Sequence, residues 1–117
     1  MTQTRLIGLS GSLLTNATNS MLLREAARLF GDADYTHADL DLPLYNGDDE
    51  GRDGVPAKVD ALAQAISDAD GVLISTPEYN AGISGVLKNA LDWISRSKTK
   101  PWQGKPVAIM SAAAGRS

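Results

Sequence analysis

One loop of this chain combines the residue types that can hold a flat, polar ligand. It follows a short apolar run at residues 71–75 and carries a carboxylate, a phenol and an amide in succession, at Glu78, Tyr79 and Asn80. A proline and a glycine in the same loop interrupt any regular structure. Such a loop can present backbone N–H groups to the edge of a planar heterocycle. Ligands of open α/β sheets bind where a strand gives way to a helix in this manner.

A second loop of small polar residues, residues 10–19, follows the first apolar run at residues 5–9. Its hydroxyl and amide side chains, together with the free N–H groups at the start of the next helix, form an anion site that needs no lysine. A turn rich in serine, threonine and asparagine that only caps the helix is the alternative interpretation. Both interpretations place this loop at a strand-to-helix junction.

Three well-known motifs for phosphate binding or nucleophilic catalysis are absent. No G-x-G-x-x-G is present, because Gly8 and Gly11 have the wrong spacing, and no G-x-x-x-x-G-K-[ST] occurs. Residues 8–12 come close to the hydrolase motif G-x-S-x-G, but Ser12 stands where the last glycine is required. The only histidine, His37, lies in the wrong chain order for the triad of that fold. We therefore expect His37 to be a residue at a strand end and not a catalyst.

Apolar runs and helical periodicity alternate along the chain. Strands are expected at residues 5–9, 34–38, 71–75 and 106–111. Helices are expected where apolar residues recur at helical spacing, in three groups: Leu22, Leu23, Ala26, Ala27 and Phe30; Val59, Leu62, Ala63 and Ile66; Leu87, Ala90, Leu91 and Ile94. Residues 40–54 are expected to form a loop, since prolines and glycines interrupt them. Trp93 lies off the apolar face of its helix, so we expect it to pack on a neighbouring helix or on a second subunit.

Strands that alternate with helices predict an α/β fold with a parallel sheet built from right-handed βαβ units. The expected strand order is 2-1-3-4, the flavodoxin-like doubly wound arrangement, and the sequence contains no segment for a fifth strand. The 117 residues suffice for a single domain with one core, spanning residues 1–117, with no internal repeat or interdomain linker.

Composition argues against several classes of function. The sequence has 43% hydrophobic and 21% charged residues, as ordinary globular proteins have, and its first apolar run is too short for a signal sequence or a membrane span. Its net charge of −3 argues against nucleic acid or an anionic membrane as a partner. The lack of cysteine excludes disulfides, thiolate catalysis and cysteine-ligated metals, and it agrees with a cytoplasmic location.

Charges are distributed unevenly along the chain. Acidic residues dominate from Asp32 to Asp60, and basic residues dominate from Lys88 onward. A solvated surface explains this pattern, and steering of a nucleotide phosphate toward the site is the alternative. The acids at residues 48–53 miss the spacing of a calcium-binding EF-hand, so we expect a solvated loop and no metal site there.

Several segments carry motifs of one known family. Residues 77–80 read P-E-Y-N, residues 87–93 read L-K-N-A-L-D-W, and residues 41–46 read D-L-P-L-Y-N. Residues 11–19 match three positions of the pattern G-S-x-R-x-x-S-x-N. These segments resemble the NAD(P)H-dependent FMN reductase family, which includes quinone and chromate reductases. The resemblance runs over nearly the whole chain and is strongest from residue 71 to residue 93.

The resemblance implies FMN as the cofactor and NAD(P)H as the co-substrate of an oxidoreductase. A hydride would pass from the nicotinamide to bound FMN, and electrons would then reach a quinone, free flavin or a similar small-molecule acceptor. The flavin carries this chemistry, so the resemblance implies ligand-contact residues and no catalytic side chain. The implied contact residues are Ser10, Ser12, Leu14, Thr15, Asn16, Ala17, Thr18, Asn19, Pro77, Glu78, Tyr79, Asn80, Ala81, Gly82, Ala112, Ala113 and Gly115.

The resemblance also implies a role for each segment of the site. The loop at residues 10–19 would hold the FMN phosphate, with Leu14 and Ala17 in place of the arginine and second serine of the motif. Backbone N–H groups at residues 78–80 would face the pyrimidine side of the flavin ring and stabilise negative charge on reduced flavin. Tyr45 would either lie near the flavin or cover the edge of the sheet.

Family members continue past the last loop with a helix, a fifth strand and a final helix, so the resemblance implies a chain truncated at its C-terminus. The fourth strand would then be an exposed edge that favours association, and a homodimer or homotetramer is expected. Two alternatives to the reductase remain. One is an FMN electron carrier without NAD(P)H activity, and the other is a non-catalytic truncated homologue that acts as an interaction protein.

Overall fold

A computed structural model describes residues 3–12, 18–77 and 84–112 of the chain. Its elements, in chain order, are β1 (Thr4–Ser10), α1 (Thr18–Phe30), β2 (Ala33–His37), α2 (Gly47–Asp53), α3 (Ala57–Asp68), β3 (Gly71–Pro77), α4 (Gly85–Ser95) and β4 (Val107–Ala112). All four expected strands are present, and each lies within two residues of its expected bounds.

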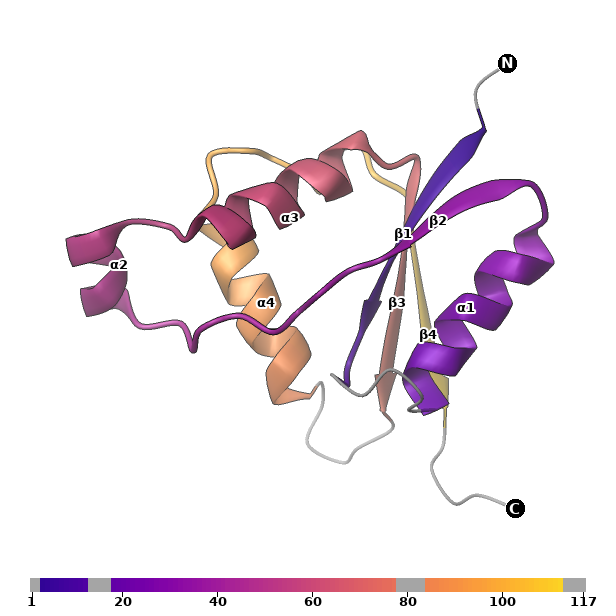
Figure 1. Ribbon diagram of the computed structural model, residues 1–117, viewed down its shortest axis with the longest axis horizontal. Helices are drawn as coiled ribbons and strands as arrows, with labels where there is room; N and C mark the ends of the chain where they lie inside the picture. Colours follow the sequence, from indigo (N-terminus) through magenta and orange to yellow (C-terminus); the bar gives the residue numbers. More distant parts are fainter. Residues whose placement is uncertain (1–2, 13–17, 78–83, 113–117) are drawn as a thin grey trace.

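The four strands form one parallel sheet in the order β2-β1-β3-β4, as expected (Figure 1). β1 lies between β2 and β3, so that Ile7 stands opposite Thr36 on one side and Val72 on the other. β4 pairs with β3, opposite the side occupied by β1. Because the strands are parallel, their carboxyl ends all point to the same end of the sheet.

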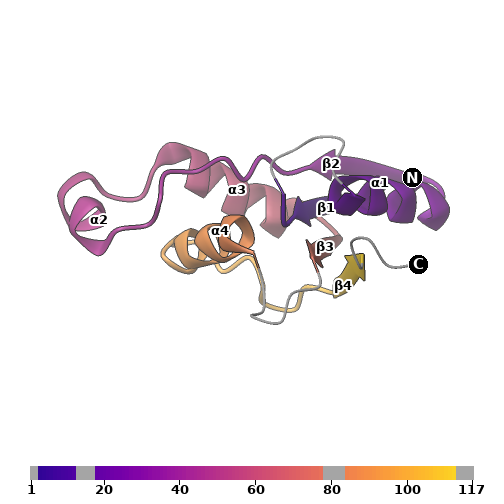
Figure 2. The ribbon, with the colours of Figure 1, turned by 90° about the horizontal axis from the view of Figure 1, so that it is seen from below.

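The helices cover both faces of this sheet, which makes a doubly wound α/β fold. α1 lies against one face, while α3 and α4 lie against the other (Figures 1 and 2). The main apolar core forms on the α3 and α4 side. Its largest contributions come from alternate residues of β1 and β3 and from the two helices: Ile7, Leu9, Val72, Ile74, Leu62, Ile66, Leu87 and Ile94.

The apolar helix faces predicted from periodicity are mostly buried. On α3 all four predicted residues, Val59, Leu62, Ala63 and Ile66, are buried. On α4 the buried members are Leu87, Ala90 and Ile94, with Leu91 partly buried. On α1, Leu23 and Ala27 are buried, but Phe30 at the end of the helix is 58% exposed, so its assignment to the buried face is wrong.

The reason for the exposure of Phe30 is an open apolar hollow on the α1 side of the sheet. The hollow measures about 410 Å³ and is lined by parts of α1, β1, β3 and β4, including Leu6 and Leu73. On β4 itself, Val107 and Ile109 are 41% and 70% exposed. Within the described part of the chain, β4 is therefore an edge strand with uncovered apolar side chains. Every helix described is too short or too polar to span a bilayer.

Residues 47–53 form the helix α2, where the sequence analysis predicts a loop. Asn46 caps this helix, because its side-chain oxygen accepts hydrogen bonds from the N–H groups of Asp48 (2.8 Å) and Asp49 (3.3 Å). Acids in the first turn also interact favourably with the positive end of the helix. Gly54 ends the helix with a φ of 79°. The helix buries no residue, so periodicity gives no sign of it, and the signals in the sequence are the capping asparagine, the acids after it and the final glycine.

Trp93 holds the segment before α2 against α4. Its indole Nε1 donates to the Pro43 carbonyl (2.7 Å), and its ring meets the Tyr45 ring edge-on with centroids 4.9 Å apart. Asn89, one turn earlier, donates to the same carbonyl (3.0 Å) and accepts from the Tyr45 N–H (2.7 Å). Trp93 is only 2% exposed. Its hydrogen-bond partner belongs to a loop from fifty residues earlier, a contact that the sequence analysis does not anticipate. Tyr45 likewise packs on α4 and not on the edge of the sheet.

Glu50 joins α2 to the end of α4. Its carboxylate accepts hydrogen bonds from the Tyr45 hydroxyl (2.9 Å) and from Arg96 Nε, at 3.0 and 2.9 Å to the two oxygens. The Glu50 side chain is 15% exposed, while that of Arg96 is 52% exposed. The hydrogen bond from Arg96, and after it the bond from Tyr45, lower the pKa of Glu50. The folded chain therefore binds this proton less tightly than the unfolded chain.

We expect Glu50→Gln to lower the melting temperature at neutral pH. A lowered carboxyl pKa stabilises the fold above the unfolded pKa, about 4.3 for Glu. That contribution is lost as the pH falls through the lower folded pKa. The difference between wild type and variant should therefore shrink below about pH 4, as thermal unfolding followed by circular dichroism can measure.

Glu25→Gln is the matched control for this prediction. Glu25 forms an ion pair with Arg28 on α1, and the side chains are 50% and 69% exposed. The bond from Arg28 lowers the pKa of Glu25 too. An exposed ion pair contributes little to the stability of the fold, so the control variant should melt at nearly the same temperature as the wild type. A Glu50→Gln difference that stays constant from neutral to acidic pH would contradict the assignment.

Candidate functional site

The carboxyl ends of β1, β3 and β4 lie side by side at one end of the sheet (Figure 1). Ser10 stands opposite Ser75, and Pro77 stands opposite Ala112. The sheet thus brings together three predicted contact residues, Ser10, Pro77 and Ala112, that are far apart in the sequence. In open α/β sheets, ligands bind outside this end of the strands.

The first polar loop leaves β1 through a set of buried hydrogen bonds. Ser10 is 1% exposed, and its hydroxyl oxygen accepts from the Ser12 N–H (3.2 Å) and from the Ser20 hydroxyl (3.0 Å). Between them, the Gly11 N–H donates to the Ser75 carbonyl on β3 (2.7 Å). Ser20 and Ser75 are themselves fully buried. The start of the loop is therefore held to β3 and to the first turns of α1.

Ser20 and Ser75 are functional candidates that the sequence analysis does not single out. Ser75 ends the expected third strand, and Ser20 directly follows the predicted contact residue Asn19. A buried hydroxyl indicates a specific hydrogen-bond partner, because a polar group in a core is almost always hydrogen-bonded. The signal in the sequence is a serine in place of an apolar residue at the end of a buried strand.

α1 starts close to this end of the sheet, because Ser20 in its first turn reaches Ser10. Thr18 and Asn19, both predicted contacts, form the first two positions of the helix. The N–H groups of a first helical turn have no partner within the helix, and they carry the positive end of the helix dipole. These N–H groups and the dipole suit an anion such as a phosphate ester.

The other helix that starts at this end is α4. Ser84 caps it, since its hydroxyl oxygen accepts from the Leu87 N–H (3.3 Å). Serine is among the residues preferred at the N-cap of a helix. The cap fixes where the second polar loop ends and the helix begins.

The remaining predicted contacts lie outside the described residues. They are Leu14, Thr15, Asn16, Ala17, Glu78, Tyr79, Asn80, Ala81, Gly82, Ala113 and Gly115. Their predicted roles in ligand binding stay predictions. The contact role of Ser10, Ser12, Thr18, Asn19, Pro77 and Ala112 also stays a prediction, although the fold places these residues at the expected end of the sheet.

Two titratable side chains, Tyr35 and His37, interact on the edge strand β2. The Tyr35 hydroxyl is 2.7 Å from His37 Nδ1. Burial raises the pKa of Tyr35 to about 12, and burial followed by the nearby Arg24 lowers the pKa of His37. Both groups are therefore neutral at pH 7, and they share one hydrogen bond. His37 is the last residue of β2, which confirms its expected place at a strand end.

Many of the unevenly distributed charges pair with one another on the surface. Lys88 pairs with Asp92 (3.0 Å) within α4, and Lys58 pairs with Asp39 (3.0 Å). The Lys105 ammonium group donates to carbonyls at the end of α3, including that of Ser67 (3.0 Å). These contacts agree with a solvated, paired surface. Within the described residues, no group of three or more acidic or histidine side chains could hold a metal ion.

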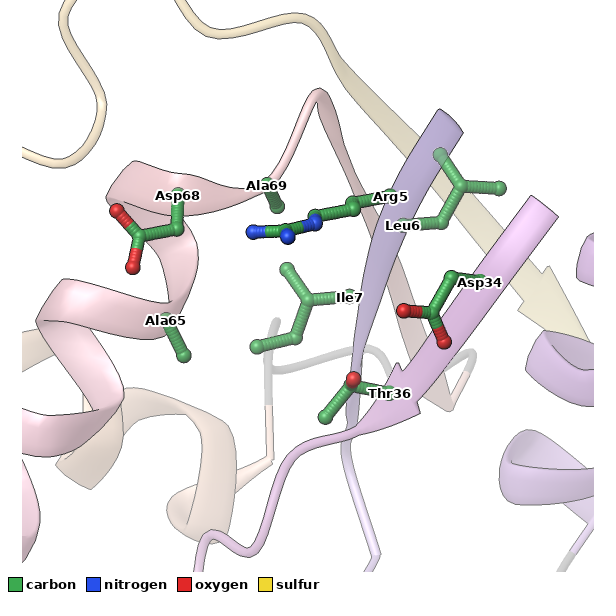
Figure 3. Close-up of a pocket in the computed structure, with 8 residues that line it drawn as sticks. All are labelled: Arg5, Leu6, Ile7, Asp34, Thr36, Ala65, Asp68 and Ala69. Atoms are coloured by element: carbon green, nitrogen blue, oxygen red, sulfur yellow. The ribbon is translucent and has the colours of Figure 1, made fainter. Parts of the chain in front are cut away.

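A separate hollow lies toward the amino ends of the strands, away from this site. It measures about 230 Å³, and its lining comes from the first half of β1, from β2 and from the end of α3 (Figure 3). The Arg5 side chain extends over it toward the end of α3, while Asp34 and Thr36 project from β2 (Figure 3). Because ligands of this fold bind at the carboxyl ends of the strands, we do not assign the site here.

The parallel order β2-β1-β3-β4 and the polar loops at the carboxyl ends define a flavodoxin-like α/β protein. The family described as NADPH-dependent FMN reductase matches residues 4–117. The chain belongs to this family.

Individual relatives agree with this assignment. The chain is 41% identical over 114 residues to a quinone reductase of Escherichia coli (strain K12), covering 95% of this chain and 61% of that protein. It is 44% identical over 114 residues to an NAD(P)H-dependent FMN reductase of Pseudomonas aeruginosa, covering 96% and 61%. Among solved structures, the flavoenzyme NAD(P)H:(acceptor) oxidoreductase FerB from Paracoccus denitrificans superposes with a TM-score of 0.81 at 34% identity, covering 96% of this chain and 62% of that one. The chain thus spans about three fifths of the length of these relatives.

Proposed function

We propose that this chain forms the FMN-binding part of an NAD(P)H-dependent reductase. Bound FMN would supply two-electron chemistry, taking a hydride from NAD(P)H and returning electrons to a quinone, free flavin or a similar acceptor. With a quinone, the net reaction consumes NAD(P)H and one proton and yields NAD(P)⁺ and the hydroquinone. No side chain needs to act as an acid, base or nucleophile in this scheme.

The observation that carries the proposal is that β1 and β3, the strands that lead into the two polar loops, end side by side in a chain of this family. Ser10 and Ser12 begin one loop, and Pro77 ends the strand that leads into the other. The described donors at the first loop are the N–H groups at the start of α1, which Ser20 ties to the end of β1, and the loop sequence adds neutral hydroxyls and amides. Together these groups fit a phosphate dianion without a cationic side chain.

The chain's own residues would bind and orient the cofactor. The first loop would hold the phosphate, and backbone N–H groups at residues 78–80 would face the pyrimidine side of the ring. The small residues Ala112, Ala113 and Gly115 would let backbone approach the flat ring closely. The Ser84 cap would set the position at which the second loop passes into α4.

An absorption experiment tests this proposal. The purified chain is mixed with FMN, separated from free flavin, and then treated with NADPH without oxygen. We expect a retained flavin band that bleaches. A retained band that NADPH does not bleach would indicate an electron carrier that needs a partner enzyme, and not a reductase. A colourless protein would contradict FMN binding by this chain and favour a non-catalytic role.

We further propose that the chain associates with copies of itself, as a homodimer or homotetramer. The exposed apolar side chains Val107 and Ile109 on the edge strand β4 support this proposal. Sedimentation velocity decides it, and a single species of 12.3 kDa at all concentrations would contradict it. The cytoplasmic location remains a prediction from the sequence.

A further inference from the structure

Ser10 and Ser20 are two buried serines whose hydroxyls meet beneath the first polar loop. Their oxygens are 3.0 Å apart, and the residues are 1% and 0% exposed. We propose that this hydroxyl pair is a positioning device that holds the loop in shape for the phosphate of FMN. The inference rests on the proposed function. It replaces the predicted cofactor contact of Ser10 with a role that acts through the loop, and it assigns the same role to Ser20.

The hydroxyl pair links the two ends of the loop to each other. Ser10 is the last residue of β1, and Ser20 is in the first turn of α1, so the loop at residues 11–17 lies between the two serines. The Ser10 oxygen also accepts from the Ser12 N–H (3.2 Å), which bends the chain back as it leaves the strand. One oxygen atom therefore fixes the exit from β1 and the entry into α1. A loop held in this way loses less conformational freedom when it binds a ligand.

The same contacts determine which amides face a ligand. The Gly11 N–H donates to the Ser75 carbonyl (2.7 Å), and the Ser12 N–H donates to Ser10. The first two N–H groups of the loop therefore point into the protein and are not available to a phosphate. A phosphate at this loop would therefore be held by groups further along the chain, up to the start of α1, which the hydroxyl pair ties to the end of β1.

Ser97 provides a matched control with the same local geometry far from the site. It is 8% exposed and follows α4, its oxygen accepts from the Thr99 N–H at the same 3.2 Å, and its hydroxyl donates to Asp60 (3.3 Å). Removing any of these buried hydroxyls disturbs a hydrogen bond, so all three alanine variants should melt at a lower temperature. Only the loss of the Ser10 and Ser20 hydroxyls should affect a phosphate at the first loop.

The test compares the affinities of the whole chain for FMN and for riboflavin, which lacks the phosphate, by quenching of flavin fluorescence. We expect the wild type to prefer FMN. Ser10→Ala and Ser20→Ala should each weaken FMN binding about tenfold and leave riboflavin binding nearly unchanged. Ser97→Ala should keep the wild-type preference. Because the two hydroxyls act as a pair, the double variant should lose little more than either single variant.

The outcomes separate this inference from the proposed function. If the wild type binds FMN and riboflavin equally, the proposed phosphate site is wrong and the inference fails with it. If the wild type prefers FMN and both variants keep that preference, only the inference fails. Amide hydrogen exchange at Ser12 gives a readout without flavin: exchange should be faster in Ser10→Ala than in the wild type, and unchanged protection would also overturn the inference.

Discussion

Trp93→Ala is expected to destabilise the fold by about 3–5 kcal/mol, the usual cost of removing a buried aromatic side chain. Trp93 is 2% exposed and supports the Tyr45 ring at a centroid distance of 4.9 Å. Its indole also donates to the Pro43 carbonyl, so the substitution removes packing and a hydrogen bond together. Urea unfolding followed by fluorescence of the remaining tryptophan, Trp102, measures the loss.

Trp93→Phe separates the two contributions. A phenyl ring keeps most of the apolar contact but lacks the indole N–H. Asn89 still donates to the Pro43 carbonyl (3.0 Å), so that acceptor keeps a partner. The cost should therefore be close to that of one hydrogen bond, about 1 kcal/mol. A loss of less than about 1 kcal/mol in Trp93→Ala would show that the loop before α2 does not depend on this residue.

Gly8→Ala is expected to lower the free energy of unfolding by about 1–3 kcal/mol, as overpacking of a core typically does. A Cβ atom at Gly8 would lie 2.1 Å from the Tyr35 hydroxyl oxygen and 2.8 Å from two carbons of its ring. The Tyr35 hydroxyl is held by His37 at 2.7 Å, so the ring cannot move away without losing that bond. Thermal or urea unfolding of the variant measures the cost.

A double-mutant cycle with Tyr35→Ala tests the cause of this effect. Without the Tyr35 ring, Gly8→Ala should hardly change the free energy of unfolding, because the clash is then gone. Gly51→Ala in α2 is the control, since a Cβ there meets no atom within 4 Å and alanine favours a helix. An equal cost of Gly8→Ala with and without the Tyr35 ring would mean that the strain lies elsewhere.

The expectations that the structure confirms rest on local periodicity. The apolar spacing of Val59, Leu62, Ala63 and Ile66 predicts a helix face, and all four residues are buried. Alternation of strands and helices predicts the parallel order β2-β1-β3-β4, because right-handed crossovers leave few other arrangements. These features depend on neighbouring residues along the chain, so the sequence alone reveals them.

The expectations that fail, and the contacts that the sequence does not anticipate, depend on residues far apart in the sequence or on structure without an apolar face. α2 buries no residue, so only the residues at its two ends, such as the Asn46 cap, reveal it. Trp93 lies off the predicted stripe and is buried only because residues 43–45 return over α4. Phe30 has the right spacing for the buried face of α1, but the described residues leave the hollow beside it open.

The candidate site divides in the same way. Its place, at polar loops after β1 and β3, follows from the sequence, because strand-to-helix junctions of a parallel sheet share one end. The sequence motifs also identify the family. The tertiary structure alone decides that Ser10 faces Ser20 rather than solvent, that the first two amides of the loop turn inward, and that Ser84 caps α4. Periodicity determines which segments form strands and helices, whereas the partner of each buried polar atom depends on how those elements pack.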